Sequence, residues 1–391
     1  MYKTLSTGVA MFAMLFGAGN VAFPLALGRE SGNTVGWSII GFCITAVLVP
    51  LFGLVSIMLY NGDYRVFLGR IGSIPGLILT GICMILVGPF GAIPRCINMA
   101  YAATKWYFPT FPLLYFSITI AHVIFFSALK QGNVVDLIGK FLGPLKLFLL
   151  FGIITIGLFW MHGTLSIVNV SIPNAIIKGA IEGYGTMDLL GTIFFAGLIV
   201  QSLKKNTKSN GKESDSNSEE EYKNLAIRGL RAGIVGAILL GSVYAGFCLV
   251  AAIHGPNIEN TDKYELLNSL APYILGKHGG VLTNFTIGVS CFVTALALTV
   301  VFSEYLQKTV FKGSINYTIA LLITVITSCL MSNLGFNKIM SLISPIIAAC
   351  YPALIVLSAM NMMHKLFQIH LVKLPVFLTL AGTLITMYFQ S

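Results

Sequence analysis

Residues 11–24 read MFAMLFGAGNVAFP and lie inside an uncharged segment that runs from Thr4 to Gly28. The segment is long enough to cross a bilayer. Its middle contains two glycines and an asparagine followed by a proline, and these residues raise the cost of regular helix. Unwound backbone is tolerated at membrane depth only where protein buries it or where it lines a cavity. Broken helices of this kind carry substrate and ion sites in secondary transporters, whereas a simple kink or a glycine packing contact is the alternative.

The composition indicates a polytopic membrane protein. Hydrophobic residues make up 56% of the 391 residues, charged residues make up 10%, and the mean hydropathy is +0.86. A soluble globule of this composition would lack a polar coat. Apolar runs long enough to span a bilayer predict eleven helices. They lie at 4–28, 35–59, 73–104, 110–129, 141–161, 187–203, 225–253, 279–307, 315–333, 338–360 and 370–389.

The positive residues predict an orientation. With the N-terminus inside and eleven alternating spans, 17 of the 24 Lys and Arg residues fall in cytoplasmic segments and 6 in exterior ones. Cytoplasmic loops carry an excess of Lys and Arg, so we expect a protein of the cytoplasmic (inner) membrane with its N-terminus inside. The net charge of +10 then reflects topology, and no nucleic-acid partner is expected. Residues 204–224, KKNTKSNGKESDSNSEEEYKN, predict a disordered cytoplasmic loop.

A second interruption opens the second half of the chain. Residues 173–182 have the pattern of a short helix, residues 183–188 read GYGTMD, and an apolar run then resumes to Val200. An ordinary exterior loop is the alternative, but interruptions at the openings of both halves indicate an inverted-repeat transporter. The helix that starts after Gly17 offers free amides to a carboxylate, and the carbonyls that end the other half-helix suit an ammonium. Together they predict a receptor for a zwitterion.

Three motifs resemble one family. They are GAGN with Phe23-Pro24, GPFGAIPR at residues 88–95, and EGYGTMD at residues 182–188. The chain resembles the branched-chain amino acid:cation symporters of the amino acid–polyamine transporter superfamily. The resemblance implies an all-α, leucine-transporter-like fold of two inverted five-helix repeats with discontinuous helices 1 and 6. The repeats are expected at 1–161 and 162–360, with an additional C-terminal helix at 361–391.

The resemblance also implies a function and a substrate site. It implies import of leucine, isoleucine and valine, and of methionine as a further candidate, by cation symport. The expected substrate-binding residues are Gly17, Ala18, Gly19, Asn20, Gly183, Tyr184, Gly185 and Thr186. The amides of Ala18 and Gly19 are expected to hold the carboxylate, and the backbone of residues 183–186 the amine. An apolar pocket discriminates one methylene by only about 1–3 kcal/mol, so these substrates could share the site.

The coupling ion is where this chain departs from the family. The resemblance implies a sodium site of carbonyls at Ala13, Phe16 and Ser290 with two adjacent hydroxyls. Here those two positions are Val293 and Thr294, so one oxygen ligand is missing. The fifth span also carries Lys146 where the family has an aliphatic residue. This pattern resembles sodium-independent transporters of the superfamily, in which such a lysine stands near the sodium position.

Two interpretations of Lys146 therefore remain at this point. Its ammonium could replace the cation and exchange a proton, because a buried lysine titrates readily. Close to the cytoplasmic boundary, it could instead extend its charged end to the interface. Coupling to sodium, to protons or to neither stays open on the sequence alone.

Two further ionisable residues lie in or beside spans. Arg95 is expected toward the exterior end of the third span, where it would face a vestibule or pair with Asp188 or Glu182. A purely structural ion pair and contact with the substrate are both open for it. An intramembrane arginine is costly enough to indicate a functional site. Asp188 is expected to cap the resumed helix, and support of a ligand site is the alternative.

Other classes of function fit the residues less well. An enzyme would need convergent His, Asp, Glu or Cys residues within the bilayer, and those present are few and scattered, so no catalytic site is expected. No metal site is expected either, and sodium is the one candidate ion in place of a cofactor. A small neutral amino acid and the lipid bilayer are the expected partners, with no obligatory protein partner. An exchanger of other neutral amino acids and a channel remain alternatives.

Overall fold

The computed structural model describes residues 2–105, 107–129, 134–159, 165–208, 218–258 and 266–390, and the regular elements in these ranges are helices. The first half contains α1 (Tyr2–Leu15), α2 (Ala18–Ser31), α3 (Val35–Cys43), α4 (Val49–Met58), α5 (Tyr64–Gly69), α6 (Ser73–Val87), α7 (Ala92–Lys105), α8 (Leu113–Ala128), α9 (Val134–Leu137) and α10 (Gly143–Phe159). The second half contains α11 (Ile172–Tyr184), α12 (Asp188–Lys208), α13 (Ser218–His254), α14 (Leu266–Tyr305), α15 (Tyr317–Ser332), α16 (Phe336–Phe367) and α17 (Lys373–Gln390).

Both predicted helix interruptions are confirmed. The chain leaves helical geometry between Leu15 and Ala18, and again between Tyr184 and Asp188. At the second break α11 and α12 are bent by 43° relative to each other. Met187 has a positive φ of 65°, which explains why the helix does not continue through this turn.

The apolar helices agree with a membrane protein. Six are long and apolar enough to cross a bilayer, or seven if α11 and α12 form one bent span, and four shorter apolar helices accompany them in the described ranges. The count of eleven spans stays a prediction. The third predicted span is less regular than expected, because a turn at 88–91 separates α6 from α7. A Cβ on Gly91 would lie 1.9 Å from the Leu86 carbonyl oxygen, so this turn requires glycine.

The predicted disordered loop at 204–224 is helical at both ends. Helix α12 continues to Lys208 and α13 begins at Ser218. Polar residues can therefore extend a helix beyond its apolar run. The remainder, 209–217, lies outside the described residues.

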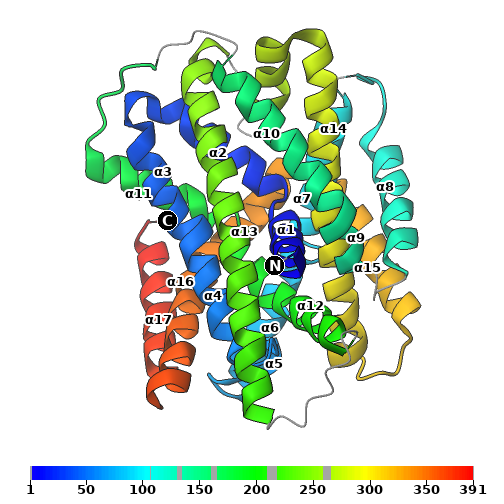
Figure 1. Cartoon of the computed structure of the whole chain (residues 1–391), viewed down its shortest axis with the longest axis vertical. Helices are drawn as coiled ribbons and strands as arrows, with labels where there is room; N and C mark the ends of the chain where they lie inside the picture. The colour runs from blue at the N-terminus through cyan, green and yellow to red at the C-terminus, as the bar shows by residue number, and fades with distance from the viewer. Residues whose placement is uncertain are drawn as a thin grey trace.

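The first broken helix, made of α1 and α2, lies in the interior of the bundle (Figure 1). Helices α1 and α2 both pack on α13, which runs along the long axis of the molecule (Figure 1). Helices α7 and α14 pack on each other, α8 and α15 pair at one edge, and α16 and α17 pair at the opposite edge. This arrangement surrounds the unwound backbone with protein, as the bilayer requires.

Glycines bring α3 and α11 into close contact. A Cβ on Gly41 of α3 would lie 2.0 Å from the Ile176 carbonyl oxygen, and one on Gly179 of α11 would lie 2.1 Å from the Ser38 carbonyl oxygen. Gly179 and Gly183 are four residues apart, the spacing of small residues that lets transmembrane helices approach closely. The packing of these helices therefore depends on the absence of side chains.

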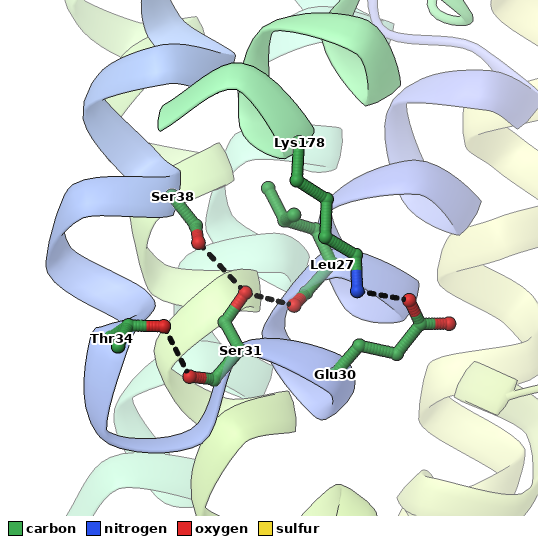
Figure 2. A network of polar contacts seen from close by, with 6 residues as sticks. All are labelled: Leu27, Glu30, Ser31, Thr34, Ser38 and Lys178. Atoms are coloured by element: carbon green, nitrogen blue, oxygen red, sulfur yellow. Dashed lines mark hydrogen bonds and ion pairs between the residues drawn. The ribbon is translucent and has the colours of Figure 1, made fainter. Parts of the chain in front are cut away.

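Polar contacts link the C-terminal end of α2 to α3 and α11 (Figure 2). The Ser31 hydroxyl lies 2.6 Å from the Leu27 carbonyl oxygen and 2.9 Å from the Ser38 hydroxyl. Lys178 of α11 forms a 2.8 Å ion pair with Glu30 of α2, although both side chains are substantially exposed. An exposed pair contributes about 0–1 kcal/mol, so it orients the two half-helices more than it stabilises them.

We expect Gly179→Ala to destabilise the protein by about 1–3 kcal/mol, because the added methyl group overlaps a backbone carbonyl that cannot move aside. Thermal unfolding of the purified protein in detergent measures this effect. Gly36→Ala is the matched control, since a Cβ on Gly36 of α3 meets no atom within 4 Å. Equal melting temperatures for the two variants would contradict the glycine-dependent contact.

Candidate functional site

The two helix breaks lie against each other. Gly17 separates α1 from α2, and Gly185 lies in the turn between α11 and α12. A Cβ on Gly185 would lie 2.5 Å from the ring of Phe23 on α2, and a Cβ on Gly19 would lie 3.4 Å from the Gly185 carbonyl oxygen. The glycines therefore allow the two interrupted segments to approach.

A cavity of about 40 Å³ lies at this junction. One water molecule needs about 10–15 Å³, so the cavity has room for roughly three. A branched-chain amino acid is considerably larger than this volume. The lining residues are Met14, Leu15, Gly17, Ala18, Gly19, Asn20, Val87, Ala92, Arg95, Cys96, Thr186, Met187, Asp188, Gly191, Phe195, Thr294 and Leu298.

The first turn of α2 presents backbone donors at the cavity. Gly17 has an extended backbone (φ −107°, ψ −153°), and its N–H donates to Oδ1 of Asn20 at 2.9 Å. In an unbroken helix this N–H would donate to the Ala13 carbonyl. Ala18 and Gly19 belong to the first turn, whose N–H groups have no intrahelical acceptor. Residues 17–20, the predicted set from this break, thus come together at the cavity wall.

The predicted residues of the second break divide into two groups. Thr186 lines the cavity, and its hydroxyl donates to the Gly183 carbonyl at 2.8 Å. Gly183 itself packs on the segment between α3 and α4. A Cβ on Gly183 would lie 2.0 Å from Oγ1 of Thr45 in that segment. The Tyr184 ring packs edge-on against Tyr351, with centroids 5.2 Å apart. Thr186 therefore faces the cavity, whereas the other two support the turn behind it.

Arg95 lies in the first turn of α7, beside the same cavity. Its side chain is 2% exposed. Nη2 donates to the Gly185 carbonyl at 3.4 Å, and Nη1 lies 2.8 Å from Sδ of Met187. The guanidinium carbon lies 5.8 Å from the ring centroid of Phe23 and 5.7 Å from that of Phe336. The arginine is thus buried among protein groups and does not face an open vestibule.

Asp188 connects three helices. Its carboxylate accepts hydrogen bonds from Nδ2 of Asn20, at 2.7 and 2.8 Å, and from the Tyr244 hydroxyl at 2.6 Å. Asn20 and Tyr244 also contact each other. The expectation that Asp188 caps its own helix is wrong, because these partners are side chains of α2 and α13. The carboxylate instead links α12 to both.

The predicted ion-coupling residues form one cluster. Nζ of Lys146, on α10, donates to the carbonyl oxygens of Ala13 at 3.0 Å and Ser290 at 3.3 Å, and it also contacts that of Phe16. The Thr294 hydroxyl lies 3.2 Å from the Phe16 carbonyl and 3.5 Å from that of Ala13. All five residues, from α1, α10 and α14 and the break itself, therefore converge.

The boundary interpretation of Lys146 is wrong. Its side chain is 0% exposed, and Nζ lies 5.1 Å and 5.9 Å from the ring centroids of Phe16 and Phe12. The Ala13 carbonyl has lost its helical donor, because the Gly17 N–H turns to Asn20. The ammonium supplies the missing donor.

Similarity to known proteins places this chain in a family. The profile described as "Branched-chain amino acid transport protein" matches residues 1–390. The chain belongs to this family. It is 29% identical over 375 residues to the branched-chain amino acid permease BraB of Bacillus subtilis (strain 168), covering 93% of this chain and 81% of that one. It is 27% identical over 362 residues to the branched-chain amino acid permease BrnQ of Escherichia coli (strain K12), covering 90% and 79%.

Solved structures agree in fold. The inward-facing conformation of Mhp1 matches with a TM-score of 0.62 at 12% identity, covering 93% of this chain and 77% of that one. MhsT in complex with L-phenylalanine matches with a TM-score of 0.59 at 14% identity, covering 96% and 98%. Such low identities show the fold alone, and they confirm the predicted leucine-transporter-like class. The family consists of transport proteins, which confirms that the chain is not an enzyme.

Several residues of the cavity and of the hydrogen-bond network around Asp188 were not predicted from the sequence. Tyr244 lies within the apolar run at 225–253, and Phe195 and Leu298 lie within two others. Nothing local distinguishes them from the packing residues around them. Arg95 and Asp188 carried a signal, since ionisable residues within spans are rare, but their partners depended on the fold.

We expect Asn20→Ala to destabilise the protein by more than about 2 kcal/mol. The change removes the donor that contacts both oxygens of Asp188 and the acceptor of the Gly17 N–H, and such losses cost about 1–3 kcal/mol each. Thermal unfolding in detergent measures the loss. Asn316→Ala is the matched control, because Asn316 caps α15 through one exposed hydrogen bond worth about 1 kcal/mol. A smaller loss at position 20 than at position 316 would contradict the network's role.

Proposed function

We propose that this protein is a secondary active transporter that imports branched-chain amino acids through the cavity between the two helix breaks. The observation that carries the proposal is the convergence of both breaks on one small cavity in a chain of this family. Relatives named branched-chain amino acid permeases support the substrate class.

The chemistry of the walls supports the substrate class. In our proposal the amides of Ala18 and Gly19 hold the carboxylate, and the segment that ends at Thr186 lies toward the amine. The aliphatic side chain would contact apolar walls supplied by Met14, Leu15, Val87, Phe195 and Leu298. Such walls distinguish one methylene by only about 1–3 kcal/mol, so leucine, isoleucine, valine and methionine would compete. The charge bias supports insertion in the inner membrane with the N-terminus inside.

Lys146 would replace the coupling cation. In our proposal its ammonium occupies the place of a sodium ion among the carbonyls of Ala13, Phe16 and Ser290. A sodium ion entering this space would meet a positive charge within hydrogen-bond distance of the same oxygens. Loss of the lysine proton would remove the charge that holds α1 to α10 and α14. Proton exchange at Lys146 would therefore couple to the position of the first helix.

We expect Gly19→Val to abolish binding of leucine while the protein stays folded. A Cβ at this position would lie 2.6 Å from Nη2 of Arg95, so the side chain takes the space beside the amides of Ala18 and Gly19. Equilibrium binding of labelled leucine to purified, monodisperse protein measures the effect. Gly152→Val on α10 is the control, since a Cβ there meets no atom within 4 Å. Unchanged leucine affinity in Gly19→Val would refute the proposed site.

We expect uptake in proteoliposomes to depend weakly on sodium and to increase with an inward proton gradient. The reason is that the ammonium of Lys146 occupies the carbonyl cluster and takes the place of sodium. Initial leucine uptake is measured against sodium at fixed pH, and then against pH without sodium. Lys146→Ala should lose the pH dependence. Lys140→Ala should keep it, because Lys140 is exposed and paired with Asp136. Steep, saturable activation of the wild type by sodium would refute this coupling.

A further inference from the structure

Two side chains of opposite charge type line the cavity. One is basic, Arg95 on α7, and one is acidic, Asp188 on α12. The remaining walls are backbone, aliphatic or aromatic side chains, and a few neutral polar groups. A buried charge is expensive, so two of them at one small cavity call for a reason beyond packing.

Arg95 is oriented toward the amides of α2. Its guanidinium is held by the Gly185 carbonyl and lies between the rings of Phe23 and Phe336. A Cβ on Gly19 would lie 2.6 Å from Nη2. A carboxylate at the first turn of α2 would therefore lie beside the guanidinium. Planar guanidinium groups match carboxylates through two parallel hydrogen bonds.

Asp188 is oriented by uncharged groups. An amide from Asn20 and a phenol from Tyr244 fix its carboxylate at the start of α12. Neither group neutralises its charge. Thr186, which also lines the cavity, lies two residues earlier in the turn where the amine of a substrate is expected. An ammonium in that place would give the carboxylate a charged partner.

We propose that Arg95 and Asp188 bind the two ends of the substrate directly, Arg95 the carboxylate and Asp188 the ammonium. This inference rests on the proposed function and adds two side chains to a site otherwise built from backbone. The site is then electrically neutral and selects a neutral zwitterion. A ligand that lacks either charge cannot make one of these two charge-assisted contacts, so it should bind more weakly than leucine.

The test uses two leucine analogues that each lack one charge. Leucinamide keeps the ammonium and replaces the carboxylate, and 4-methylpentanoate keeps the carboxylate and lacks the amine. Competition against labelled leucine on the purified full-length protein gives a preference for leucine over each analogue. In the wild type we expect both preferences to exceed tenfold.

Each variant that removes a charge should reduce the preference for leucine over one of the two analogues. Asp188→Asn should weaken leucine at least tenfold and reduce its preference over 4-methylpentanoate by a similar factor, while the preference over leucinamide stays. Arg95→Gln should do the reverse. Asp188→Glu and Arg95→Lys keep the charges, so both should keep both preferences even where affinity falls. Tyr244→Phe is the positioning control, since it removes one hydrogen bond from Asp188 and should weaken leucine without altering either preference.

Two results would overturn the inference. One is a loss of leucine affinity in Asp188→Asn and Arg95→Gln with both preferences unchanged, which would indicate structural roles. The other is unchanged leucine affinity in both variants. If the two neutral variants do not fold, loss of both preferences in the charge-preserving pair counts against the inference as well. A wild type that binds no leucine would instead refute the proposed function itself.

Discussion

The structure depends on one constraint, which is that backbone groups freed by a helix break must find partners where no water is present. The break after α1 frees the carbonyls of Ala13 and Phe16 and the N–H of Gly17. Lys146 satisfies the two carbonyls, and Asn20 satisfies the amide. A break at this depth is stable because residues far away in the sequence replace its lost helical bonds.

The same partners connect the break to the rest of the bundle. Lys146 belongs to α10, and Asn20 extends its contacts to Asp188 and Tyr244 on α12 and α13. If α1 moves relative to these helices, the hydrogen bonds of Lys146 and Asn20 must therefore break and reform together. A proton or a substrate that changes one member of the set would favour one arrangement over another. This is the physical basis on which binding and coupling could be linked in the proposed transporter.

Glycine has two distinct roles in this arrangement. At Gly19 and Gly185 it leaves room for another break or for Arg95, whereas at Gly41 and Gly179 it lets α3 and α11 touch through backbone. The first role shapes the cavity, and the second keeps one half-helix attached to its neighbour. The ion pair between Glu30 and Lys178 adds a weak connection at the outer ends (Figure 2).

The sequence by itself determined the membrane class and the positions of both helix breaks, because hydrophobic runs and glycines are local features. The residues of the carbonyl cluster came from the resemblance to a known family. Only the tertiary structure decided the orientation of Lys146 and Asp188 and the burial of Arg95. A span of the same composition is compatible with each of these three side chains being solvated, paired or buried. Their partners, such as Tyr244 and the Ser290 carbonyl, lie more than fifty residues away, and only folding brings them within hydrogen-bond distance.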